Sequence, residues 1–296
     1  MQELGWAPSP PLFQMQRTNL HPAKFEINTV LEWEDWKHVV LPRIAAAAKL
    51  PIRRLKAFPA HTGHAVIVGA GPSAVNFVEK IKGFSNQPLT TFFSVNGAHQ
   101  WLIERELKPK IHVLFEHDVD TCRTSLGGLP DPEVVYYVAS HCSPDVFREL
   151  HGYRYILWHA FIPLQEYQDA INTHFPGEFM VAGGYATFFR TLTIAYLLGY
   201  RDFDLFGVDS SFESNSHLDG YPTSNVEESI SVWGVDPRDD TIRKFTSQGG
   251  LAFQASEFIK FCEQYHKDIK LRVHGDSLLR YLHETRYPEQ YQSLEG

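Results

Sequence analysis

Cysteine is scarce in this sequence, with three residues in 296, at Cys122, Cys142 and Cys262. Their odd number, their wide spacing and the lack of any CxxC pair exclude a disulfide framework and a paired-cysteine metal site. A reducing cytoplasm is therefore the expected location. Residues 1–15 contain three prolines but no basic segment, so no secretory signal is expected there.

The sequence also has fewer basic than acidic residues, and it has no long apolar run. The chain has 27 Lys and Arg against 35 Asp and Glu, a formal net charge of −8, which argues against a nucleic-acid partner. No apolar run approaches the roughly 18 residues that a membrane span requires, so no span is expected. The nucleophile elbow and the Walker lysine are missing, which argues against serine-type hydrolases and P-loop kinases.

What the chain does contain is a regular alternation of two patterns. From His64 onward, short β-branched and aromatic runs alternate with amphipathic segments, as in βαβ units. This predicts an α/β fold, with a mostly parallel sheet and helices on both faces. The expected strands are residues 65–68, 91–95, 111–115, 134–138, 155–158, 203–206 and 271–273. The expected helices are residues 73–82, 98–106, 144–150, 184–198 and 251–265.

Two stretches depart from that alternation. Residues 1–62 are expected to form an N-terminal arm and a small helical cap, with two or three short helices interrupted at Pro42 and Pro51. Residues 63–296 then make up the main domain. Within it, residues 210–250 are rich in Ser, Asn, Asp and Gly, and so long a hydrophilic stretch is typical of a working loop.

Polar or glycine-rich turns follow several of the expected strands. Ligands of open parallel sheets bind outside the carboxyl ends of the strands, so these turns outline a candidate site. They are residues 69–73, 96–98, 116–120 and 207–211, and His217 follows the last of them.

The first of these turns fits the pattern G-x-G-x-x-A between a strand and a helix. Gly69 and Gly71 permit a close backbone approach. Pro72 suits the first helical turn, and Ser73 adds a hydroxyl, so the turn can hold a phosphate. A tight turn that binds nothing is the alternative interpretation.

The nucleotide held by this turn is not expected to be a dinucleotide. A dinucleotide site needs an acidic residue about 20 positions further on, where it accepts from the ribose hydroxyls. No Asp or Glu occurs in residues 83–103. The second turn offers Asn96 and Gly97 instead, which are either a plain turn or an amide that reads a base or a ribose.

The third and fourth turns carry the charged candidates. Glu116, Asp118 and Asp120 alternate after an apolar strand, and an extended chain would point all three to one side. Such a cluster suits Mg²⁺, although a solvated strand end, a helix cap or a single carboxylate on ligand hydroxyls fits as well. Asp209 either caps a turn or serves the site. His217 is the candidate general base, because imidazole titrates near neutral pH, and His117 is a second candidate.

Taken together, the segments resemble one superfamily. VIVGAGPSA, FFSVNGA, FEHDVD and GGYATFFRTLTIAYLLGYRDFDLFGVDSSF occur in its order, and the resemblance covers about residues 63–282. The superfamily contains the 6-hydroxymethylpterin diphosphokinase MptE-like proteins and shares a domain with the motility-associated-factor (Maf) glycosyltransferases. Bacterial sialyltransferases are similar. The resemblance implies a Rossmann-like nucleotide-binding transferase domain over residues 63–296.

The resemblance also implies a role for each matched residue. The nucleotide-binding positions are Gly69, Gly71, Pro72, Ser73, Asn96, Gly97, Asp118 and Gly184. The catalytic positions are Asp209 and His217, of which His217 matches the sialyltransferase base, while Asp118 and Asp120 are the candidate Mg²⁺ ligands. Archaeal diphosphokinases carry Asp-Leu-Asp-Gly and a late His-Gly-Asp-Asn, where this chain has Asp-Val-Asp and the segment HGDS at residues 274–277.

Three functions therefore stay open. The first is a sialyltransferase-like glycosyltransferase that uses a CMP-sugar type of donor, with a small molecule or glycan as acceptor and His217 as the base. The second is Mg²⁺-dependent transfer of diphosphate from ATP to a hydroxymethylpterin-like acceptor. The third is a nucleotide-binding module without catalysis.

Overall fold

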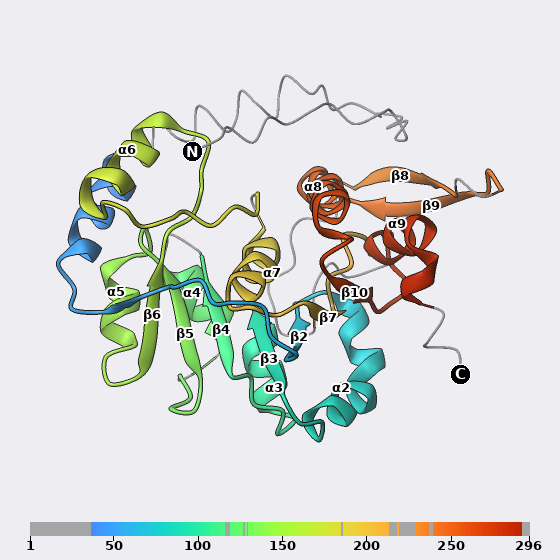
Figure 1. Cartoon of the computed structure of the whole chain (residues 1–296), viewed down its shortest axis with the longest axis horizontal. Coiled ribbons are helices and arrows are strands. Elements are labelled where there is room, and N and C mark those ends of the chain that lie inside the picture. Colours follow the sequence, from blue (N-terminus) through green and yellow to red (C-terminus); the bar gives the residue numbers. More distant parts are fainter. Residues whose placement is uncertain are drawn as a thin grey trace.

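One parallel sheet forms the centre of the molecule (Figure 1). The structure is a computed structural model that describes residues 37–115, 119–126, 128, 130–184, 186–212, 218, 229–236 and 239–291. Eight strands lie in the order β1-β6-β5-β4-β3-β2-β7-β10, and every neighbouring pair is parallel. Their bounds are β1 Arg53–Arg54, β2 His64–Val68, β3 Thr90–Val95, β4 Ile111–Leu114, β5 Val135–Ala139, β6 Arg154–Trp158, β7 Asp202–Phe206 and β10 Lys270–Val273. The seven expected strands are confirmed.

Helices cover both faces of the sheet, as expected for a Rossmann-like fold. Those between the strands are η1 Pro72–Phe77, α2 Val78–Ser85, α3 Ala98–Ile103, α4 Val119–Leu126, α5 Pro144–Glu149, α6 Gln165–His174, α7 Thr187–Leu197 and α8 Gly249–Tyr265. After β10 come α9 Leu278–Arg286 and η3 Pro288–Gln290. Within the described ranges, no helix has the length and apolar character needed to cross a bilayer.

Residues 65–68 of the central strand β2 are apolar because both faces of the strand are buried there. Ala65 and Ile67 belong to the large hydrophobic core that includes residues of α7 and α8. Val66 and Val68 point the other way, into a smaller core with η1, α2 and α3. Successive side chains of a strand alternate between faces, so a strand buried on both faces carries no polar position.

The segment before β2 is joined to this core. Residues 37–48 are helical, and Val40, Ile44 and Ala47 are buried in the large core. The helix continues through Pro42, contrary to the expected interruption, because burial of this apolar side offsets one lost backbone hydrogen bond. The two residues of β1 then pair with β6 at the edge of the sheet.

The stretch expected to be one long loop contains a hairpin. β8 (Ile230–Val235) and β9 (Ile242–Ser247) pair antiparallel, outside the main sheet. In Figure 1 the hairpin lies beside α8 and α9, at the end of the molecule opposite α6. Val232 and Phe245 bury their side chains in the large core, which holds the hairpin in place.

Candidate functional site

The chain reverses its direction across the sheet at β2. It runs outward through β3, β4, β5 and β6, then returns to place β7 and β10 on the other side of β2. Such a switch point leaves a crevice at the carboxyl ends of the two central strands, where ligands of open sheets bind. The turns after β2 and β7 meet here, since Gly69 N–H donates to Phe206 O and Gly71 N–H donates to Gly207 O, both at 2.8 Å.

The glycines of these two turns are required by backbone contact. A Cβ on Gly69 would lie 2.4 Å from Gly207 O, and a Cβ on Gly207 would lie 2.4 Å from Gly69 O. Gly207 also has a φ of +62°, in the left-handed region that favours glycine. This packing accounts for Gly69 without any ligand, so the glycines alone do not distinguish a phosphate loop from a tight turn.

The polar centre of the crevice is a contact between Ser73 and Asp209. The Ser73 amide donates to Asp209 Oδ2 at 2.9 Å, and the Ser73 hydroxyl donates to Oδ1 at 2.5 Å. Pro72 fills the first position of η1 before it. Asp209 is 5% exposed, and this burial raises the pKa of its carboxyl to about 6, although both Ser73 bonds favour the charged form.

A third turn, after β10, closes the same crevice. Gly275 has a φ of +114°, and a Cβ there would lie 2.6 Å from Ser73 Oγ and 3.2 Å from Asp209 Oδ1. The Leu279 amide at the start of α9 donates to Asp209 O at 3.3 Å. The HGDS segment that the sequence singled out at residues 274–277 therefore lies beside the Ser73–Asp209 contact.

A buried ion network that sequence reasoning missed lies next to this turn. Asp204 of β7 accepts from His64 Nε2 at 2.7 Å and from Arg272 Nη2 at 2.6 Å, and its other oxygen contacts His274 Nε2 at 2.5 Å. Burial alone would raise the pKa of Asp204, but the bonds from these three partners hold it well below its usual range. The available signal was the charged Asp204 in an otherwise apolar strand centre.

This network is also the place where metal ligands come together among the described residues. His64, Asp202 and Asp204 bring three potential ligand atoms within 4.8 Å of one another. Arg272 Nη2, however, lies 2.5 Å from Asp202 Oδ1 and bonds Asp204 as well. A guanidinium already bonds both carboxylates, so the group is an ion network rather than a cation site.

The predicted nucleotide turn Asn96-Gly97 follows β3, beside β2. Asn96 adopts a φ of +50°, which Asn tolerates better than most residues. Gly97 has a φ of −58° and is the N-cap residue of α3. The structure thus places both residues at the same sheet edge as Ser73, one strand away.

Four of the candidates named from the sequence, Glu116, His117, Asp118 and His217, lie outside the described residues. The next described residue after His217 is Leu218, whose amide donates to Ala70 O at 2.8 Å, inside the first glycine turn. Asp120 does not continue an extended chain as expected, because it stands in the first turn of α4. Its exposed carboxylate accepts from Arg123 at 3.0 Å.

The predicted Gly184 lies in an irregular segment held by a buried arginine. Arg190 of α7 donates to Val181 O at 2.7 Å, to Gly184 O at 2.5 Å and to Phe161 O at 3.1 Å. Its guanidinium lies 4.3 Å from the centre of the Phe115 ring, at the end of β4. Sequence reasoning missed Arg190, although an arginine within the apolar helix pattern FFRTL was a usable signal.

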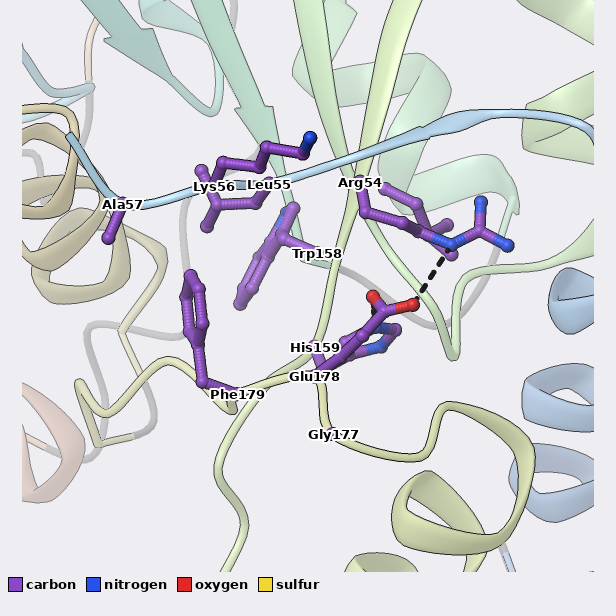
Figure 2. A pocket seen from close by; sticks show the side chains of 10 residues that line it. Arg54, Leu55, Lys56, Ala57, Trp158, His159, Gly177, Glu178 and Phe179 are labelled. Carbon is purple, nitrogen blue, oxygen red and sulfur yellow. Dashed lines mark hydrogen bonds and ion pairs between the residues drawn. The ribbon is translucent and has the colours of Figure 1, made fainter.

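A separate cavity lies at the end of β6 (Figure 2). Its volume is about 350 Å³, and it is lined by residues 54–57, 157–159 and 177–179. Glu178 lies at its rim, 2.9 Å from His159 Nε2 and 3.6 Å from Arg54 Nε. None of the described site residues predicted from the sequence lines this cavity.

Comparisons with known proteins bear on the fold and the family. A protein-family model described as 6-hydroxymethylpterin diphosphokinase MptE-like matches residues 41–215, more than half of the chain. The structure of the Maf glycosyltransferase from Magnetospirillum magneticum AMB-1 is similar, with a TM-score of 0.57 and 18% identity. That alignment covers 80% of this chain but only 37% of the glycosyltransferase, so this chain spans little more than a third of it.

A weaker likeness is to the sialyltransferase CstII from Campylobacter jejuni, in complex with cytidine-5'-monophosphate. The TM-score is 0.30 with 16% identity, over 74% of this chain and 83% of that one. A comparison with curated proteins finds no match.

Proposed function

The chain belongs to the 6-hydroxymethylpterin diphosphokinase MptE-like family, and from this membership we propose that it is a nucleotide-dependent transferase. The observation that carries the proposal is the meeting of residues 69–73 and 207–211 at the switch point of a parallel sheet. Nucleotides bind at such points because the backbone amides and hydroxyls of the turns face one crevice.

The donor that we propose is a nucleotide sugar of the CMP-sugar type. Gly69, Gly71, Pro72 and Ser73 would hold its phosphate, while Asn96, Gly97 and Asp118 would orient the base or ribose, with Gly184 nearby. The Maf glycosyltransferase that shares this fold is named for glycosyl transfer, which supports a sugar as the transferred group. The acceptor is a small molecule or a glycan with a free hydroxyl.

The chemistry that we propose uses His217 as the general base. His217 takes the proton of the acceptor hydroxyl while the acceptor oxygen bonds to the sugar carbon and the bond from that carbon to the phosphate oxygen breaks. The leaving group is the nucleoside monophosphate, whose charge the Ser73 amide and hydroxyl can stabilise. Asp209, the second proposed catalytic residue, contacts Ser73 at that position.

The first experiment is a thermal-shift screen against CMP, CDP, UDP, GDP, ATP and NAD, each with and without Mg²⁺. A ligand at 100 times its Kd stabilises the folded state by about 2.7 kcal/mol, which raises the melting temperature measurably. Stabilisation by CMP or CDP without metal is the expected result. No rise in melting temperature with any of the six ligands would contradict the nucleotide-binding proposal.

The base is tested by His217→Ala. We expect turnover to fall about 100-fold or more, because general bases contribute on that scale, while the Kd for the nucleotide stays unchanged. The matched control is His151→Ala, an exposed histidine directly after α5. An equal loss of turnover and nucleotide affinity in His217→Ala would contradict its role as base.

The second candidate is Mg²⁺-dependent diphosphate transfer from ATP to a hydroxymethylpterin-like acceptor, which the description of the matched family favours. Asp118 and Asp120 would hold the metal, and the exposed Asp120 carboxylate would have to exchange its Arg123 partner for the ion. EDTA should abolish this activity and leave a CMP-sugar reaction intact. A nucleotide-binding module without catalysis would instead bind a nucleotide and show no turnover. The His217 substitution would leave its nucleotide affinity unchanged.

A further inference from the structure

The donors that the site offers to a phosphate are already paired inside the protein. Both polar hydrogens of Ser73, on its amide and on its hydroxyl, bond the two oxygens of the Asp209 carboxylate, at 2.9 and 2.5 Å. The carboxylate thus occupies the position of an anionic ligand. Any phosphate that uses Ser73 must take these bonds over from Asp209.

Backbone of two neighbouring turns packs closely against the Asp209 carboxylate. A Cβ on Gly71 would lie 2.6 Å from Asp209 Oδ2, and one on Gly275 would lie 3.2 Å from Oδ1. Backbone therefore lines the carboxylate from the turns after β2 and β10. Asp209 itself is 5% exposed, so solvent does not separate it from an incoming anion.

No described cation compensates the Asp209 carboxylate. The charged groups of the β10 turn are engaged elsewhere, because His274 bonds Asp204 and Asp276 pairs with Arg243. Arg272 of β10 bonds Asp204 as well.

Among the residues that the structure describes, the other groups that contact Asp209 carry no charge. From η1 it meets Ser73, and from α9 the Leu279 amide donates to its backbone oxygen. Within its own turn, the Ser211 hydroxyl donates to that same backbone oxygen at 3.4 Å. Burial without a cation raises the pKa of this carboxyl to about 6, which brings its titration close to neutral pH.

We propose that a nucleotide phosphate binds by exchange with the Asp209 carboxylate and that binding takes up one proton at Asp209. The inference rests on the proposed function. One proton from solvent bonds to a carboxylate oxygen, and Asp209 becomes a neutral acid. The Ser73 amide and hydroxyl then donate to phosphate oxygens, and the new Asp209 hydroxyl is a further donor. Two buried anions side by side are avoided.

The test measures Kd against pH from 5.5 to 8.0, with the methyl ester of CMP as the probe. Its phosphate carries one charge throughout this range, so any slope comes from the protein. For the wild type we expect Kd to rise on the order of 50-fold between pH 6 and pH 8, by linkage to one proton. Asp209→Asn, which lacks the titrating group, should bind with a Kd constant within about twofold by the same linkage. Cytidine, which has no phosphate, is the ligand control.

A second measurement needs no variant. Calorimetric titration of the wild type with the same ester at pH 7.5, in two buffers with different heats of ionisation, should report an uptake of about one proton. Binding with no uptake, or parallel pH profiles in wild type and Asp209→Asn, would overturn the inference and leave the proposed function standing. No binding of the ester or CMP to either protein at any pH would overturn both the CMP donor and the inference.

Discussion

Two buried aspartates, Asp204 in β7 and Asp209 after it, differ in the groups that bond their carboxylates. Asp204 is 1% exposed and is bonded by His64, Arg272 and His274, which hold its pKa well below the usual range against the effect of burial. Five positions later, the Asp209 carboxylate accepts from the uncharged amide and hydroxyl of Ser73, with no cation on it among the described residues, and burial raises its pKa to about 6. Two buried carboxylates thus have opposite pKa shifts.

The difference separates a structural acid from one that is available for chemistry. A buried carboxylate that is bonded by a guanidinium and by imidazole groups stays charged and is expensive to disturb. A buried carboxylate without a cation is poised between its two protonation states near neutral pH, which is the property that functional sites select. The comparison predicts that removing the charge of each aspartate changes stability in opposite directions.

The largest effect is expected for Asp204→Asn. Loss of this charge leaves Arg272 and two histidines without their buried partner, and breaking a buried ion network costs about 3–5 kcal/mol of the free energy of unfolding. Asp202→Asn is the matched control, since the Asp202 side chain is 43% exposed and its pairing with Arg272 contributes less than about 1 kcal/mol. Urea unfolding at pH 7 compares the two variants, and equal losses would contradict the assignment of Asp204 as the centre of the network.

Asp209→Asn is expected to raise the free energy of unfolding, whereas Asp204→Asn lowers it. In the folded state the Asp209 pKa is raised from 3.8 to about 6, so the wild type loses stability as the pH rises through this interval. The loss amounts to about 3 kcal/mol, at 1.36 kcal/mol for each pKa unit. Asp209→Asn should therefore be more stable than the wild type by about that amount at pH 8, and the difference should vanish near pH 4.

The quantity to measure is the difference in the free energy of unfolding between Asp209→Asn and the wild type. In each protein alone, other titrating groups oppose the fall in stability with rising pH. Burial lowers the pKa of His99, of His112 and of His283, the last to about 3. A histidine that the fold keeps neutral makes the folded protein less stable as the pH falls below the unfolded pKa of histidine, about 6.5. These histidines are common to both proteins and cancel. A stability difference independent of pH would show that Asp209 does not titrate in this interval.

Much of the fold could be predicted because its signals are local. Residues 65–68 of β2 are a continuous apolar run, as is typical of a parallel sheet that is covered on both faces. Gly69 and Gly207 also stand directly after strands, where the backbone must turn. The expected strand positions and the edge of the sheet that carries the site followed from these patterns alone.

The remaining features depend on contacts between distant residues. The hairpin β8–β9 was expected to be loop, because residues 210–250 as a whole are rich in Ser, Asn, Asp and Gly. The contact that buries Val232 and Phe245 in the large core was not visible from that composition. The partners of Asp204 come from β2 and β10, 140 and 68 residues away in the chain. No spacing rule connects such positions. For the same reason the sequence assigned Ser73 and Asp209 to one site but did not predict that they bond each other.

The smallest effect concerns the turn that connects the two aspartates, since His274 bonds Asp204 while Gly275 contacts Ser73. Gly275→Ala should cost about 1–3 kcal/mol of stability, because alanine is strained at a φ of +114° and its Cβ would lie 2.6 Å from Ser73 Oγ. Gly83→Ala in α2 is the control, where a Cβ meets no atom within 4 Å and should add about 0.5–1 kcal/mol. If Gly275→Ala also removes the pH dependence of stability attributed to Asp209, the turn couples the ion network around Asp204 to the Ser73–Asp209 contact. If that dependence is unchanged, the two aspartates act as independent regions.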